Sequence, residues 1–261
     1  MNGQNKDWFL PVSLGAGVLV IAGGLGLWWL RDNAPAPEPV ETVAPPPETT
    51  ATTVEPPPVE TTAPPRTLPL PPLDESDADV LGGLTELFGQ DAVMRFLVPE
   101  RIVRNIVVTI DNAPRQQMAL NQRPLKPTPG ELVTAGPEDA RVLAPENYQR
   151  YAPFVALVRT IDAKTLVSLY RGLQPLFQQA YEELGNPNAS FNERLIEVIE
   201  HLLATPNVRD EIRLVQPSVL YRYADERLEK LSAGQKLLIR MGPENAAVIK
   251  AKLRELQAEL V

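Results

Sequence analysis

The pattern of hydrophobic and polar positions begins with a long apolar run over residues 8–30 that holds no formal charge. Its length matches the roughly 20 apolar residues that a helix needs to cross a hydrocarbon core. Trp8 begins the run and Leu30 ends it, with two further tryptophans just before Leu30, so aromatic residues stand where the two membrane interfaces would lie. We therefore predict one transmembrane helix over residues 8–30, inserted in the lipid bilayer behind a short tail of residues 1–7.

A cleaved signal peptide is the alternative for this run. A signal core is shorter and is followed by small residues at the cleavage site, whereas this run ends in bulky residues and Arg31. The positive-inside bias is slight, because Lys6 stands on one side and Arg31 on the other. We predict a cytoplasmic amino end and an external domain, with the opposite topology as the alternative.

Small residues inside the run raise the question of helix pairing. Ala22 and Gly26 are spaced so that two membrane helices could approach closely, which predicts a homodimer through this segment. The alternative is that glycine is simply common in membrane helices.

Proline dominates the next stretch, residues 31–73, where the periodic pattern stops. Proline removes backbone donors and fixes φ, so the segment cannot build the interior of a helix or a sheet. We predict a disordered, extended linker, and forty such residues would reach on the order of 120 Å when fully extended. A ligand for a proline-binding domain is the alternative, but basic residues that would orient it are scarce.

Helical periodicity returns over residues 74–261, which we predict to form one mainly helical globular domain. Val80, Leu84 and Leu87 begin this pattern, which Gly89 interrupts. The β-branched run over residues 103–110 also has the helical spacing, although a strand is the alternative there. The predicted helices cover residues 80–88, 91–96, 99–110, 148–161, 163–184, 191–204, 236–241 and 244–260. We predict a small β-hairpin over residues 131–144. We predict an extended segment over residues 211–223.

Capping residues place several of these helix ends. Asp162 precedes one long helix. Ser190 stands three residues before Glu193, and Ser232 stands three residues before Gln235, which is the spacing of a capping box. Gly242 and Pro243 combine a helix stop with the first turn of the next helix.

Composition excludes several chemistries. The chain has no cysteine, so disulfides and thiolate sites are impossible. Its net charge is −8, and residues 74–261 carry 22 basic and 26 acidic side chains. Because such a domain offers no broad positive field to a phosphate backbone, we do not expect nucleic-acid binding.

Candidate catalytic residues are few. His201 is the only histidine, and a helix-edge or capping role is the alternative to a catalytic one. Two glutamate pairs, Glu182 with Glu183 and Glu193 with Glu197, could supply carboxylates for glycoside hydrolysis, which needs two such groups across a cleft. Carboxylates on a helix are usually solvated instead. We find no motif for a phosphate, a metal or an activated serine, and we expect no catalytic, cofactor or metal site.

Two clusters are candidate interaction surfaces, because tyrosine and arginine often anchor interfaces. They comprise Asn147, Tyr148, Arg150 and Tyr151 in the first, and Arg240, Glu244 and Asn245 in the second. The alternative for the first is that its tyrosines pack against neighbouring helices. The alternative for the second is a helix-joining turn held by an Arg–Glu contact.

Several sequence stretches, including parts of these two clusters, resemble those of a known protein family. The stretches NYQRY at residues 147–151, YEELG at 181–185 and RMGPEN at 240–245, together with residues 221–231, follow one another in the order of a known pattern. Over residues 74–261 the chain resembles the bacterial family called domain of unknown function 3014. The resemblance implies an amino-terminal anchor, a proline-rich linker and one carboxy-terminal domain in a proteobacterial envelope. It implies no activity and no site residue.

The predicted anchor and extended linker, together with the lack of catalytic motifs, suggest a function. Our hypothesis is a binding or scaffolding module, anchored in the bacterial inner membrane with a periplasmic domain, that meets an envelope protein or the cell wall. The rival hypotheses are a wall-active enzyme that uses carboxylates and a cytoplasmic-facing recruiter.

Overall fold

The computed structural model describes residues 70–119, 121–217 and 221–261, which form a mainly helical domain with small antiparallel strand pairs. Short 3₁₀ turns occupy Leu73–Glu75 and Glu138–Ala140. The helices are α3 (Asp77–Phe88), α4 (Gln90–Phe96), α5 (Ile102–Asn112), α6 (Glu146–Gln149), α7 (Ala152–Thr160), α8 (Ala163–Glu183), α9 (Phe191–Leu203), α10 (Glu226–Glu229), α11 (Ala233–Arg240) and α12 (Pro243–Leu260). The predicted mainly-α class is confirmed.

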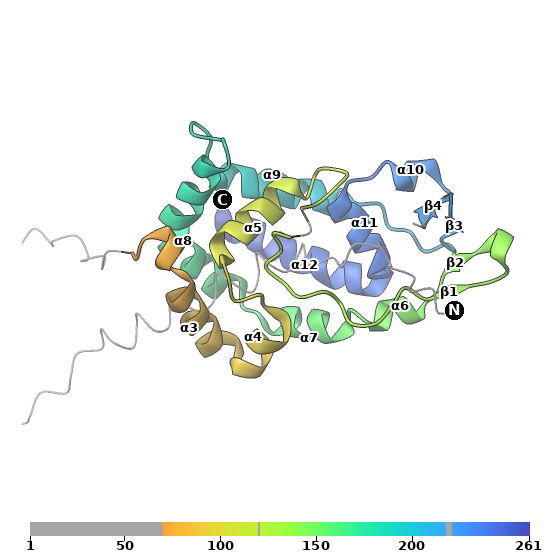
Figure 1. The fold of residues 1–261 in the computed structure, drawn as a ribbon, viewed down its shortest axis with the longest axis horizontal. Helices are drawn as coiled ribbons and strands as arrows, with labels where there is room; N and C mark the ends of the chain where they lie inside the picture. Colours follow the sequence, from red (N-terminus) through yellow and green to blue (C-terminus); the bar gives the residue numbers. More distant parts are fainter. Residues whose placement is uncertain (1–69, 120, 218–220) are drawn as a thin grey trace, which may run out of the picture.

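Helix α12, the last in the chain, lies at the centre of the fold, with α7, α8, α9 and α11 packed around it (Figure 1). It buries Ile249, Leu253 and Leu256 in the main core. The spacing of these residues gives α12 one fully apolar stripe. Ala246, Val248 and Leu260 of α12 are partly buried and pack against the same core.

Polar side chains tie α12 to three neighbouring segments, with each contact at the end of a helix. Lys252, which is 8% exposed, donates from Nζ to the carbonyl of Ile161 at the end of α7, at 2.6 Å. Lys250 donates in the same way to the carbonyl of Thr205, just after α9. Arg171 of α8 donates to the carbonyl of Glu259 at 2.7 Å. Cations at these positions stabilise the negative ends of helices, whose last carbonyls lack intrahelical donors.

Helix α5 is buried along most of its length and packs on α8 and α9. The strand alternative for residues 103–110 is therefore wrong. The helix also begins later than predicted, at Ile102 rather than near Pro99. The carboxylate of Asp77 accepts from the backbone N–H groups of Arg101 and Ile102, the latter at 2.7 Å, and thereby caps the helix from a distant part of the chain.

The strands form two short hairpins at one end of the long axis (Figure 1). Strand β1 (Thr134–Ala135) pairs with β2 (Val142–Leu143), which confirms the predicted hairpin, and β3 (Leu214–Val215) pairs with β4 (Arg222–Tyr223). A bridge between Val142 and Arg213 joins the two hairpins. A second, smaller core is buried under them, formed by Leu143, Ile212, Leu214, Tyr223 and Ile239.

The single helix predicted over residues 148–161 is two helices, α6 and α7. Pro153 has no N–H to donate to the carbonyl of Gln149, so the α-helical ladder cannot run through this point. The chain instead tightens, and Tyr151 donates its N–H to the carbonyl of Tyr148, three residues back, at 3.2 Å.

The predicted membrane helix, with its Ala22–Gly26 pair, and nearly all of the predicted linker lie outside the described residues. Among the residues that the structure describes, no helix combines the length and the apolar character needed to cross a membrane.

Candidate functional site

The two predicted clusters, around residues 147–151 and 240–245, contact each other directly. Asn245 donates from Nδ2 to the carbonyl of Tyr148 and to that of Met241, both at 2.9 Å. Gly242 lies against the Tyr148 ring so closely that a Cβ there would stand 2.5 Å from the ring. The clusters therefore form one junction between α6 and the α11–α12 turn.

Most polar groups of the first cluster bond within the fold. Asn147 is 1% exposed; its Oδ1 accepts from the N–H of Val133 at 3.0 Å, and its Nδ2 donates to the carbonyls of Val133 and Ala144. Arg150 donates to the carbonyls of Pro129 and Gly130, at 3.0 and 2.6 Å. These two side chains fix the loop that leads into β1.

Tyr151 and Arg240 of the junction are also buried, each 7% exposed. Arg240 donates from Nε to the carbonyl of Lys236 at 3.3 Å and hydrogen-bonds the hydroxyl of Tyr223. Burial raises the pKa of Tyr223 to about 12, although the positive charge of Arg240 opposes that rise. Burial thus favours the packing interpretation for Tyr151, and it leaves Asn147 and Arg240 little surface to offer a partner. Glu244 alone among the seven predicted surface residues is exposed, while the other three are partly buried.

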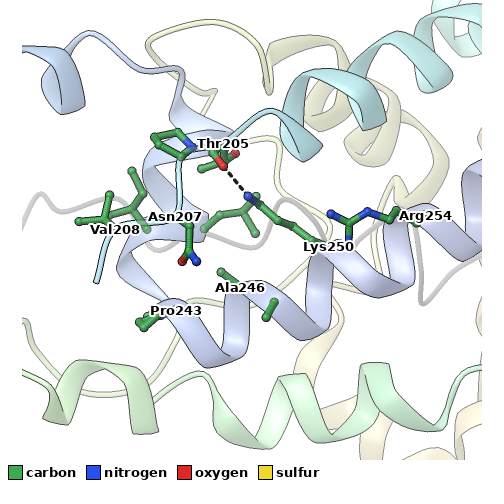
Figure 2. Close-up of a pocket in the computed structure, with 12 residues that line it drawn as sticks. Thr205, Asn207, Val208, Pro243, Ala246, Lys250 and Arg254 are labelled. Atoms are coloured by element: carbon green, nitrogen blue, oxygen red, sulfur yellow. Dashed lines mark hydrogen bonds between the residues drawn. The ribbon is translucent and has the colours of Figure 1, made fainter. Parts of the chain in front are cut away.

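A cavity that the sequence did not single out opens beside this junction (Figure 2). Its volume is about 270 Å³. It lies where the main core, through Leu238, meets the smaller core, through Ile239. The lining comes from the loop after α9, from α11 and from one face of α12: Thr205, Pro206, Asn207, Val208, Leu238, Ile239, Gly242, Pro243, Ala246, Ala247, Lys250 and Arg254.

The α12 wall of the cavity follows from helical spacing. Ala246, Lys250 and Arg254 recur every four residues and therefore share a face. The small side chain of Ala246, beside Ala247, leaves the space near the start of the helix open. The longer basic side chains border it further along α12, as Figure 2 shows.

Lys250 holds one edge of the cavity in place. Its ammonium donates to the carbonyl of Thr205, whose own hydroxyl donates to the carbonyl of Leu202 at 2.6 Å. Burial lowers the pKa of Lys250, and the nearby positive charge of Arg254 lowers it further. An ammonium has three N–H donors, so two remain for a ligand.

Arg254 is exposed and extends its guanidinium toward Lys250 (Figure 2). The cavity lining contains no aspartate or glutamate. Within the described part of the chain, no carboxylate forms an ion pair with Arg254. Two positive groups therefore face one space without a neutralising partner, an arrangement that attracts an anion.

His201 is engaged in a structural contact. Its Nε2 lies 2.8 Å from the hydroxyl of Ser232, and its backbone carbonyl accepts from Gln235 at 3.1 Å. Ser232 and Gln235 also complete the predicted capping box of α11. His201 thus links α9 to the start of α11, which favours the capping interpretation over the catalytic one.

The four candidate catalytic glutamates are distributed over α8 and α9, and none lines the cavity. Glu183 forms an ion pair with Arg104, and Glu197 forms one with Arg194 at 3.2 Å. Glu182 accepts a hydrogen bond from the side chain of Gln178 at 2.9 Å. Among the described residues there is also no cluster of three or more histidines, aspartates and glutamates that could hold a metal ion.

Comparison with known proteins gives one match. The family model described as "Protein of unknown function (DUF3014)" matches residues 102–257, more than half of the chain. No curated protein and no solved structure matches the chain. The matched range contains the junction and the whole cavity lining.

Proposed function

The chain belongs to the DUF3014 family, whose description assigns no function, and from this premise we propose that its helical domain is a binding module on a membrane anchor. Residues 8–30 would anchor it in the bacterial inner membrane, and residues 31–73 would hold the domain at a distance. The domain would then meet a partner in the periplasm.

The observation that carries this proposal is the cavity beside the α11–α12 turn. Its lining offers two cations, an exposed amide from Asn207 and an apolar floor. Apart from the ammonium of Lys250, it holds none of the groups that most often move protons in catalysis, because it has no carboxylate, imidazole, thiol or tyrosine hydroxyl. Such a lining supports recognition of a ligand better than hydrolysis.

Photo-crosslinking in living cells tests the binding proposal. A photoreactive residue at Glu244, which is exposed and adjoins the cavity-lining Pro243, should form an adduct with a partner. The same residue at Met94, which is 58% exposed on α4, is the matched control. We expect an adduct from position 244 only, and we expect it to weaken when Arg254→Glu is added. Equal adducts from both positions, or none from either, would overturn the proposal.

Protease treatment of spheroplasts tests the proposed topology of the full chain. An antibody against the domain should lose its signal while a cytoplasmic control protein survives. Survival of the domain until lysis would place it inside the cell and would support the cytoplasmic recruiter instead.

A further inference from the structure

We propose that the cavity beside the α11–α12 turn binds a carboxylate joined to a small apolar group. This inference rests on the proposed binding function and names the chemistry of its ligand. A free small acid and the C-terminal residue of a peptide share this chemistry. The inference follows from the charge, the apolar walls and the size of the cavity.

The charge of the cavity selects an anion. Lys250 and Arg254 are four residues apart on α12, and both line the space. Lys250 has two N–H donors left after its bond to Thr205, and the guanidinium of Arg254 offers a planar fork of donors. That fork matches the two oxygens of a carboxylate.

The apolar walls favour a ligand that carries an apolar group beside its negative charge. Val208, Leu238 and Ile239 line the cavity together with Pro206, Pro243 and Ala246. A group such as a valine side chain would cover this surface and exclude water from it, which is favourable in proportion to the apolar area buried. A strongly hydrated inorganic ion would leave the same apolar surface in contact with water.

The start of α12 argues against a phosphate group. Phosphate sites at helix starts use the free backbone N–H groups of the first turn. Here Pro243 occupies the first helical position, so one of those donors is missing. This helix start therefore offers a phosphate one backbone donor fewer than such sites use.

The size of the cavity limits the ligand. Pockets for drug-sized molecules occupy roughly 300–1,000 Å³, and this one occupies about 270 Å³. It therefore accepts a single residue or a short-chain acid, and a longer peptide would leave the rest of its chain outside. Asn207, whose amide points toward the α12 wall in Figure 2, is placed to hydrogen-bond a peptide group at that exit.

Titration calorimetry on the full chain in detergent micelles tests the inference. The probes are N-acetylvaline, its C-terminal amide, isobutyrate and inorganic phosphate. We expect N-acetylvaline to bind and its uncharged amide to fail. Binding of isobutyrate as well would identify a free acid as sufficient, whereas binding of N-acetylvaline alone would identify the peptide end. Failure of N-acetylvaline and isobutyrate, or tighter binding of phosphate, would overturn the inference.

Three variants locate the binding. Arg254→Gln removes an exposed cation and should weaken N-acetylvaline at least about tenfold, the loss expected for a charge-assisted hydrogen bond. Arg159→Gln, at an exposed arginine on α7 outside the cavity, is the matched control and should change nothing. Ala247→Leu fills the cavity from the exposed side of α12 and should also abolish binding. Equal binding by all three variants would place the ligand elsewhere and overturn the inference.

The two proposals fail separately. An adduct from position 244 in cells, without binding of either carboxylate, would leave the binding module standing and overturn only the ligand chemistry. Loss of the adduct together with loss of carboxylate binding would overturn both.

Discussion

Two buried tyrosines differ in what their hydroxyls contact. The hydroxyl of Tyr170, a residue 5% exposed among the aromatic rings of α8 and α9, has no hydrogen-bond partner within the described structure. The hydroxyl of Tyr223, also 5% exposed, donates to the carbonyl of Lys236 at 3.2 Å. Burial raises the pKa of both, so both stay protonated at neutral pH. A buried hydroxyl without a partner costs free energy, whereas a bonded one is nearly neutral or favourable.

Removing each hydroxyl should therefore have a different effect on the free energy of unfolding. Tyr170→Phe should leave the free energy of unfolding unchanged or raise it by up to about 1 kcal/mol, because no hydrogen bond is lost. Tyr223→Phe should lower it by about 1–2 kcal/mol, because the hydroxyl's hydrogen bonds with the Lys236 carbonyl and with Arg240 are lost. Urea unfolding followed by circular dichroism measures both. A larger loss in Tyr170→Phe than in Tyr223→Phe would contradict the assignment.

The burial of His201 should make the free energy of unfolding depend on pH. Burial lowers its pKa in the folded state, and the positive charge of Arg194 lowers it further. The unfolded chain keeps the ordinary value of about 6.5 and binds the proton first as pH falls. Stability is therefore full above about pH 6.5 and declines as pH falls toward the lower folded pKa.

The variant His201→Gln isolates this contribution. It should lose the decline that begins near pH 6.5, while the acid unfolding caused by carboxylates at lower pH remains. Urea midpoints measured from pH 8 to pH 5 for both proteins give the difference. Parallel curves over that range would show that His201 does not titrate with unfolding.

At the scale of elements, the α11–α12 turn depends on a glycine. Gly242 has φ 84° and ψ 159°, a backbone conformation that is essentially restricted to glycine. The Tyr148 ring also fills the place of a Cβ. Gly242→Ala should cost about 2–5 kcal/mol, from backbone strain and overpacking together.

Gly172 provides the matched control for that change. It is an exposed residue within α8, and no side-chain or backbone atom of another segment lies within 4 Å of the position that a Cβ would occupy. Gly172→Ala should raise the free energy of unfolding by about 0.5–1 kcal/mol, because alanine loses less backbone entropy in a helix. Urea unfolding of the pair checks both signs, and a Gly242→Ala variant as stable as the parent would refute the strain.

Helix ends that depend on neighbouring residues were predictable from the sequence. Asp162 caps α8 by accepting from the N–H of Thr165 at 2.7 Å, and Ser190 caps α9 by accepting from Glu193 at 3.3 Å. Ser232 does the same for α11. In each case the donor lies three residues away, so a short stretch of sequence contains the whole interaction.

Ends that depend on distant residues were not predictable. The start of α5 is held by Asp77, more than twenty residues earlier, and no local pattern encodes that contact. The sequence therefore placed this helix but misplaced its first turn.

For the whole molecule, the sequence singled out the residues of the junction, as two separate surfaces, but not the cavity. Both residue clusters were singled out because of their composition, and the fold brings them together through Asn245 and Tyr148. Lys250 and Arg254 share a helix face by spacing alone. Their opposite wall, around Asn207, comes from a loop about forty residues earlier. Only the packing of α9 against α12 creates the space between them.

The central position of α12 makes the carboxy-terminal helix essential to the fold. A chain that ends at Met241 should lose the cooperative thermal transition in circular dichroism, because α7, α8 and α9 would lose the surface on which they pack. A chain that begins at residue 70 and keeps α12 is the control and should unfold cooperatively. A cooperative transition in the shortened chain would show that the remaining helices form a core without α12.

The same position of α12 has a consequence for synthesis. Helices α7, α8 and α9 leave the ribosome first, with the apolar sides that α12 later covers still facing water. Their partner α12 is synthesised after all three of them, so the core cannot be completed until α12 has left the ribosome. Folding domains with exposed apolar surface are prone to aggregation. Nascent chains of this protein should therefore depend on chaperones until α12 has emerged.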